Sequence, residues 1–297
     1  MSDTERTERA HAKINLLLRI LAREAGGYHG IETLFQRLAL HDLVHVRVGT
    51  MAPSLSCTGP TMPARGLGPV EQNLAWRAAT AYVAASGWDT GWAIDIEKQI
   101  PVGGGLGGGS ADAAAVLRAF EAMCPTPLGA ARLLEIAGGL GADVPFLVSD
   151  VSRAWAWGRG DRFVPLPPLP TATVWLATFA DGVNTGAAYA AFARARDARG
   201  DTVRALAYPA LAFDSWASIA ALAANDFEAV VSTMHAGVAT VLPTLRTAAA
   251  ALRDEQGVPA IGMMSGSGAT CFLLQAGPDA TLPPSSLPAR VIATHTA

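Results

Sequence analysis

The sequence predicts a globular protein of the α/β or α+β class. Segments with alternating apolar residues, which are typical of strands, recur between alanine-rich segments that are typical of helices. Hydrophobic residues make up 51% of the 297 residues and charged residues only 16%. Disordered chains have the opposite composition, so we expect a packed core. No fixed-period repeat occurs, and a repeat architecture is therefore not expected.

The first predicted strand covers residues 12–20, where Ile14, Leu16, Leu18 and Ile20 share one face. The other predicted elements follow in chain order: loop 26–30, strand 44–48, a loop-rich segment 50–70, helix 72–85, strand 92–97, a glycine run 103–109, helices 110–122 and 128–138, strand 172–179, helix 186–197, a helical region 216–253, strand 259–264, loop 265–269 and strand 270–275. The proline-rich segment from Pro165 to Pro170 predicts a boundary between domains at 1–165 and 166–297.

Charge and cysteine content narrow the class of function. The formal net charge is −3, so no global basic field attracts nucleic acid or an acidic membrane, and we expect neither as a partner. Three cysteines form no CxxC pair, which argues against a disulfide framework or a structural zinc site and suits a reducing compartment. The uncharged segment 163–180 contains four prolines and is not expected to span a membrane. We expect a cytoplasmic protein.

The strongest chemical signal is a glycine run between a predicted strand and a predicted helix. The run 103–109 and the residues beside it are Pro101, Val102, Gly103, Gly104, Gly105, Leu106, Gly107, Gly108, Gly109, Ser110 and Ala111. Without side chains, backbone N–H groups can turn inward and bind an anion, and the following helix directs its positive dipole end to the same place. A flexible linker or a tight turn is the alternative. The run contains a G-x-G-x-x-G match, but no acidic ribose partner follows at the expected distance, which disfavours a dinucleotide-binding oxidoreductase. No Gly-Lys pair exists for a Walker A loop.

Only two lysines, Lys13 and Lys98, occur beside 20 arginines. Where arginine serves as the general cation, a retained lysine is expected to need a compact ammonium. For Lys13 the alternative is a solvent-facing position on the first strand. Asp143 lies in Gly-Ala-Asp-Val-Pro, where a turn or helix-capping aspartate and a catalytic base are both plausible from the residues alone.

These motifs together resemble the GHMP kinases, the family of galactokinase, homoserine kinase and mevalonate kinase. The glycine run resembles their phosphate loop, and its doubled Gly-Gly-Gly resembles the branch that acts on a cytidine-diphosphate-linked sugar alcohol. Other segments agree in order: 12–16, Gly-Tyr-His at 27–29 with Thr-Leu-Phe at 33–35, Asn73-Leu74, 98–101, 141–146, Val183 to Tyr189, Asn-Asp-Phe-Glu at 225–228, and 264–269. The resemblance covers residues from about 10 to about 275.

The resemblance implies a two-domain α+β GHMP kinase fold, with a ribosomal-protein-like N-terminal domain and a ferredoxin-like C-terminal domain. It implies transfer of the γ-phosphoryl group of ATP to the 2-hydroxyl of that cytidine diphosphate compound, in the synthesis of isoprenoid precursors. Mg²⁺ would arrive with ATP and need few dedicated protein ligands, and the chain would be a monomer or a homodimer. The usual second serine of the loop is replaced by Ala111.

The family's residue roles carry over to matching positions of this sequence. Lys13 would lower the pKa of the reacting hydroxyl and Asp143 would accept its proton. The glycine run with Asn73 and Lys98 would bind ATP. The implied substrate-binding residues are Asn15, Tyr28, His29, Thr185, Tyr189, Gly266, Ser267 and Gly268. Tyr28 and Tyr189 would stack on the cytosine while His29 bonds its edge; core packing of Tyr189 and a plain hairpin turn at 265–269 are the alternatives.

Two other functions remain open at this point. One is another GHMP kinase, of the homoserine or mevalonate type, which would lack the Gly-Tyr-His loop and Tyr189. The other is a non-catalytic ligand sensor on the same fold, because fold does not fix function. A sensor is expected to have lost the lysine or the aspartate, yet Lys13 and Asp143 are both present.

Overall fold

The computed structural model describes residues 4–23, 29–64, 66–199, 207–209, 211–277 and 287–297. Helices and strands are mixed along the whole of this length, as the α+β class requires. The residues group into two compact units that each take several chain segments. The first unit comprises residues 1–12, 40–102 and 107–151, and the second comprises residues 13–39, 103–106 and 152–297.

Two long neighbouring strands, β1 (Glu5–Arg23) and β2 (His29–Thr50), contribute residues to both units. The sequence predicted only 12–20 and 44–48 as strands, and it wrongly assigned His29 and Gly30 to a loop. The alternating pattern fails in β2 because residues 33–36 are all buried, so both faces of the strand are apolar or hydrogen-bonded inside the protein.

The first unit packs helices against a small sheet. Its helices are η1 (Val70–Gln72), α1 (Leu74–Ser86), α2 (Gly108–Met123), α3 (Ala130–Leu140) and α4 (Val144–Val148), and its other strands are β3 (Ser54–Thr58) and β4 (Gly91–Glu97). Strand β4 pairs antiparallel with the 43–50 part of β2 and parallel with β3. Helices α1 and α2 pack together, and the rings of Tyr82 and Phe120 meet at 5.6 Å between centroids. Helix α2, which carries the end of the glycine run, is therefore fixed by a buried aromatic core.

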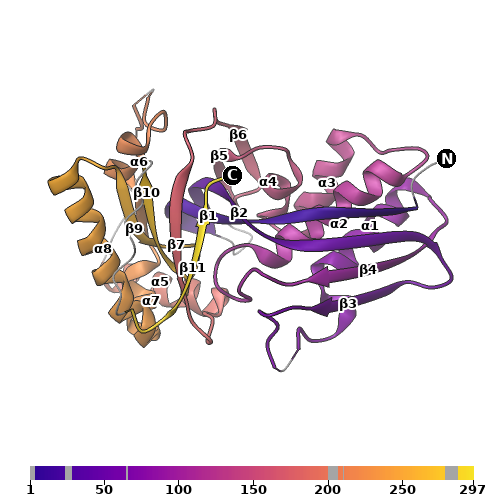
Figure 1. The fold of residues 1–297 in the computed structure, drawn as a ribbon, viewed down its shortest axis with the longest axis horizontal. Coiled ribbons are helices and arrows are strands. Elements are labelled where there is room, and N and C mark those ends of the chain that lie inside the picture. Colours follow the sequence, from indigo (N-terminus) through magenta and orange to yellow (C-terminus); the bar gives the residue numbers. More distant parts are fainter. Residues whose placement is uncertain (1–3, 24–28, 65, 200–206, 210, 278–286) are drawn as a thin grey trace. The chain divides into compact units, whose positions relative to one another are not determined.

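The second unit contains a four-stranded antiparallel sheet with strand order β11-β7-β10-β9. These strands are β7 (Ala172–Thr178), β9 (Ala260–Met264), β10 (Cys271–Ala276) and β11 (Arg290–His295), and the unit also holds β5 (Arg153–Gly158), β6 (Arg162–Pro165), β8 (Ala224–Asn225), α5 (Thr185–Arg199), α6 (Trp216–Leu222), α7 (Glu228–Met234) and α8 (Ala236–Gln256). Helix α8 packs on β9 and β10 (Figure 1). Strand β5 pairs with the 31–36 part of β2, and β8 runs parallel to β1.

The prediction for residues 216–253 was wrong in one respect. The structure divides this region into α6, β8, α7 and α8, because Asn225 pairs with Leu18 of β1 instead of continuing a helix. The sequence also did not predict α4, β5, β6 or β11, all of which have six residues or fewer. None of the described helices has the length and apolarity that crossing a membrane requires.

Candidate active site

The glycine run forms a bend that depends on the absence of side chains. Gly103, Gly105 and Gly107 have φ values of +76°, +77° and +73°, a region that residues with a side chain rarely adopt. A Cβ atom on Gly105 would lie 2.3 Å from the carbonyl oxygen of Ser265. Helix α2 begins directly after Gly107. The bend is therefore not a flexible linker, since it is held by close backbone packing.

In the second unit, three predicted site segments meet through the main chain. The N–H of Lys13 donates to the carbonyl of Leu106 at 2.9 Å, and the N–H of Thr270 donates to the carbonyl of Gly104 at 3.2 Å. The hydroxyl of Ser265 donates to the carbonyl of Gly105 at 3.0 Å. The first strand, the start of the glycine bend and the 265–269 loop thus form one connected group.

Lys13 is buried, with 4% of its surface exposed, so the solvent-facing alternative is wrong. Its Nζ donates to Asn15 Oδ1 at 2.8 Å and lies 5.5 Å from the centroid of the Phe35 ring. Asn15 Nδ2 donates to Thr33 Oγ1 at 2.7 Å, and that hydroxyl donates to the carbonyl of Leu17 at 2.7 Å. This chain of hydrogen bonds fixes which end of the Asn15 amide faces the ammonium.

The residues implied for cytosine binding also lie in the second unit. The rings of His29 and Tyr189 are stacked, with centroids 5.3 Å apart and planes 16° from parallel. Tyr189 also meets Phe227 edge-on at 4.8 Å. Thr185 Oγ1 lies 2.8 Å from Ser267 Oγ, which joins α5 to the 265–269 loop. Tyr28 lies outside the described residues.

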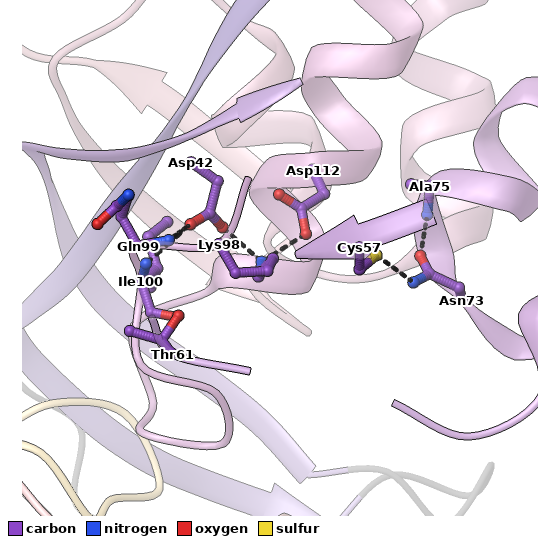
Figure 2. A network of polar contacts seen from close by, with 9 residues as sticks. All are labelled: Asp42, Cys57, Thr61, Asn73, Ala75, Lys98, Gln99, Ile100 and Asp112. Atoms are coloured by element: carbon purple, nitrogen blue, oxygen red, sulfur yellow. Dashed lines mark hydrogen bonds and ion pairs between the residues drawn. The ribbon is translucent and has the colours of Figure 1, made fainter. Parts of the chain in front are cut away.

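In the first unit, Lys98 is buried between two carboxylates (Figure 2). Its Nζ donates to Asp42 Oδ2 and, at 2.6 Å, to Asp112 Oδ2. Asp42 Oδ1 accepts the N–H groups of Gln99 and Ile100 at 2.5 and 2.7 Å. The cluster ties β2, the segment after β4 and the first turns of α2 together.

The cluster shifts the pKa values of Asp112 and Lys98. Burial raises the pKa of Asp112 to about 7, with Lys98 opposing the shift and Asp42 adding to it. Asp112 Oδ1 has no hydrogen-bond partner among the described residues. The two carboxylates more than offset the effect of burial on Lys98, and its pKa is raised. The ammonium is therefore retained as a charge beneath the start of α2, where a Cβ on Gly108 would lie 3.6 Å from it.

The other predicted residues of the first unit lie at helix starts. Asn73 caps α1, its Oδ1 accepting the N–H of Ala75 at 2.9 Å. Its Nδ2 lies 4.0 Å from the sulfur of Cys57, and Figure 2 shows the two side chains facing each other. Burial, with the charge of Asp112 second, raises the pKa of Cys57 to about 11 and keeps it a neutral thiol.

Asp143 occupies the N-cap position of α4, yet its side chain makes no capping hydrogen bond within the described residues. The capping alternative for this carboxylate is therefore not supported. Ser110 Oγ would lie 3.9 Å from a Cβ on Gly141, which puts the start of α2 next to the segment that carries Asp143. Lys13 belongs to the second unit and Asp143 to the first, so their predicted pairing stays a prediction.

Sequence reasoning missed the partners that hold the two lysines. Thr33 lay in a recognised motif without an assigned role, and the sequence did not connect Asp112, which is buried and paired with Lys98, to that lysine. Asp42 was not singled out, because 56 residues separate it from Lys98. No cluster of three or more metal-ligating side chains occurs among the described residues.

A groove of about 670 Å³ lies along α1 and α3 of the first unit. Its lining includes Trp76, Arg77, Arg132, Glu135 and Ile136. The residues that line it include none of the predicted site residues, so it is separate from the chemistry described above.

Comparison with known proteins gives consistent matches. The domain described as GHMP kinases N terminal domain matches residues 73–150. A 4-diphosphocytidyl-2-C-methyl-D-erythritol kinase from Pelotomaculum thermopropionicum is 38% identical over 272 residues, which are 91% of this chain and 89% of that protein. One from Salinispora tropica is 36% identical, covering 91% of this chain and 83% of that protein.

Solved structures agree. A crystal structure of 4-(cytidine 5'-diphospho)-2C-methyl-D-erythritol kinase matches with a TM-score of 0.73 and 32% identity, covering 98% of this chain and 99% of that one. A mevalonate kinase from L. major matches with a TM-score of 0.64 at 10% identity, covering 100% and 98% of the two chains. The second match supports the fold alone.

Proposed function

The chain belongs to the 4-diphosphocytidyl-2-C-methyl-D-erythritol kinases, within the GHMP kinase fold, and from this premise we propose how its own residues carry out the reaction. It is a small-molecule kinase that phosphorylates the 2-hydroxyl of 4-diphosphocytidyl-2-C-methyl-D-erythritol at the expense of ATP, in the non-mevalonate route to isoprenoid precursors. The observation that carries the residue assignment is the buried ammonium of Lys13, which Asn15 fixes, on a residue whose backbone N–H donates to Leu106 of the glycine bend.

Lys13 acts on the substrate hydroxyl. A fixed ammonium close to an alcohol favours its ionised form and offsets negative charge on the transferring phosphoryl group. Because Asn15 is itself held by Thr33, the ammonium does not need to be reoriented during the reaction. Asn15 thereby positions Lys13, in addition to any direct contact with substrate.

Asp143 accepts the hydroxyl proton. Phosphoryl transfer asks a protein mainly for alignment and electrostatic stabilisation, with one carboxylate to receive the proton. Asp143 stands at the N-cap position of α4, two residues after Gly141, where a Cβ would lie 3.9 Å from Ser110 Oγ, and this nearness to the start of α2 supports the assignment. A general base of this kind contributes about 100- to 10,000-fold to turnover.

The glycine bend and the start of α2 bind the triphosphate of ATP. This proposal is supported by the side-chain-free bend, whose backbone is held in place by close packing of Gly105 on Ser265, and by the N–H groups at the start of a 16-residue helix. Ala111 is 1% exposed, so the hydroxyl that the family usually has there would face the interior of this protein. Ser110 and the amides remain available to the phosphates.

Mg²⁺ enters with ATP and needs few protein ligands, since it commonly keeps waters and phosphate oxygens. The chemistry that it would supply is neutralisation of negative charge on the phosphates. Lys98, held by Asp42 and Asp112, supports the loop that holds those phosphates and Asn73 caps the helix beside it.

The cytidine end of the substrate contacts His29 and Tyr189, with Tyr28 as the second aromatic partner. Stacking of a base on an aromatic ring contributes about 1–3 kcal/mol. Thr185, Gly266, Ser267 and Gly268 present hydroxyl and amide groups to the substrate phosphates. We also propose that the chain acts in the cytoplasm as a monomer or homodimer, and that residues 1–165 and 166–297 correspond to the two family domains.

An ATP-consumption assay with three acceptors tests the function. Only the cytidine diphosphate compound is expected to support rapid ATP consumption, whereas homoserine and mevalonate are not. Preference for either of the other two would contradict the substrate assignment, and no consumption with any acceptor would support a non-catalytic ligand sensor.

A further inference from the structure

The Asn-Asp-Phe-Glu segment at 225–228 contacts the 265–269 loop through its side chains. Asn225 is 6% exposed, and its Nδ2 donates to two carbonyl oxygens, those of Met264 and Gly266, each at 2.8 Å. Its Oδ1 accepts the N–H of Phe227 at 2.9 Å. Both amide hydrogens and the amide oxygen are therefore used, and the side chain spans the first residue of the loop.

Glu228 binds the backbone of Met264 as well, but it accepts a hydrogen bond where Asn225 donates one. Its Oε1 accepts the N–H of Met264 at 2.8 Å, and its Oε2 accepts from Arg246 Nη2 at 2.5 Å. Met264 thus has its carbonyl bound by Asn225 and its N–H bound by Glu228. The end of β9, where the loop begins, has little freedom to shift or rotate.

The segment is in turn anchored to the strand that carries Lys13. Asn225 pairs in parallel register with Leu18 of β1. The N–H of Asp226 donates to the carbonyl of Leu18 at 3.0 Å, and its Oδ2 accepts the N–H of Ile20 at 2.8 Å. The 225–228 segment therefore links the 265–269 loop to β1. All of these residues lie within the second unit.

The loop also contacts the glycine bend at close range. Ser265 Oγ donates to Gly105, and a Cβ on Gly266 would lie 3.1 Å from the carbonyl oxygen of Gly105. A displacement of the loop would consequently displace residues 103–106 as well. Effects of the 225–228 segment are expected to reach the phosphate-binding backbone without any direct contact with substrate.

We propose that Asn225 and Glu228 are positioning residues that set the 265–268 backbone, and with it the start of the glycine bend, in register with Lys13 for phosphoryl transfer. This inference rests on the proposed function, which places that loop at the reacting phosphate. Neither side chain needs to touch substrate. A misplacement of about 1 Å at a reacting centre can cost about 100-fold in rate.

The test uses the full chain with ATP and the cytidine diphosphate substrate. Asn225→Asp keeps the size of the side chain and the acceptor for Phe227, but it removes both donors to the loop. We expect kcat to fall by about 100-fold, whereas the Kd for cytidine monophosphate stays at the wild-type value because His29 and Tyr189 are unaffected. Glu228→Gln, a smaller change at the same anchor, is expected to lower kcat in the same direction.

Glu121→Gln is a matched control in the first unit. Glu121 is also a carboxylate that holds a loop, accepting the N–H groups of Leu128 and Gly129 at 3.0 and 2.7 Å, and it has no place in the proposed site. It is expected to lower the Tm without lowering kcat. A folded Asn225→Asp protein with wild-type kcat would overturn the inference, as would a parallel loss of kcat and of cytidine monophosphate affinity.

Gly266→Ala separates this inference from the proposed role of the loop. It alters the loop directly and is expected to lower kcat as Asn225→Asp does. If Gly266→Ala lowers kcat and Asn225→Asp does not, the positioning role is wrong while the proposed function stands. If the wild-type enzyme is active and both variants have the same kcat as the wild type, the loop is not at the reacting phosphate.

Discussion

Replacing Gly105 by alanine tests the glycine bend with a perturbation whose size follows from the structure. The backbone at Gly105 has φ +77°, and the new Cβ would lie 2.3 Å from the Ser265 carbonyl. Left-handed backbone costs a residue with a side chain about 1–2 kcal/mol, and overpacking adds about 1–3 kcal/mol, so we expect a loss of about 2–5 kcal/mol. At about 2–4 °C per kcal/mol for domains of roughly 150–250 residues, the Tm falls by roughly 4–20 °C.

Thermal unfolding together with steady-state kinetics measures this effect. Gly257→Ala is the matched control, since Gly257 has φ +66° in the same unit with no described atom within 4 Å of a Cβ. The control is expected to lose only the backbone cost of about 1–2 kcal/mol. Gly105→Ala is expected in addition to raise the KM for ATP. Equal Tm changes in the two variants, with an unchanged KM for ATP, would refute the reasoning.

Three further outcomes follow from the site. Lys13→Met keeps a long side chain but removes the buried ammonium, and kcat measured by ADP release is expected to fall by at least about 100-fold; a near-normal kcat would exclude a role in the chemistry. His29→Ala and Tyr189→Ala are each expected to weaken cytidine monophosphate binding by about 1–3 kcal/mol in calorimetry, and unchanged affinity in both would remove them from the cytosine pocket. The pKa of Asp112 is raised to about 7. Between about pH 4 and pH 7 the folded protein therefore keeps a proton on Asp112 that the unfolded chain has already released. The stability contributed by this proton is present at low pH and is lost as the pH rises through about 7. The Tm of the wild type should therefore fall relative to that of Asp112→Asn over this range, and a constant difference would contradict the raised pKa.

The site segments could be predicted from sequence because each is local. The glycine run before a helix and the lysine on the first strand are short patterns with a direct physical meaning, and the structure joins Lys13 to Leu106. The partners that orient these groups could not be predicted in the same way. Asp42 meets Lys98 across 56 residues, and Glu228 meets Met264 across 36; such pairings exist only after the sheets have formed.

The errors in the fold have equally specific causes. Strand β2 was mostly missed because Thr33 and Gln36, which are polar, are buried beside Leu34 and Phe35, so polarity does not alternate along it. Strand β8 has only two residues, and its formation depends on pairing with β1 instead of on local propensity.

The most direct test of the account is the kinetics of Asp143→Asn. This substitution preserves the shape of the side chain and removes its ability to take a proton. We predict that kcat falls by about 100- to 10,000-fold while the Kd values for cytidine monophosphate and for a non-hydrolysable ATP analogue match the wild type. A cleanly folded Asp143→Asn enzyme with near-normal kcat would contradict the assignment of the base and, with it, the proposed mechanism.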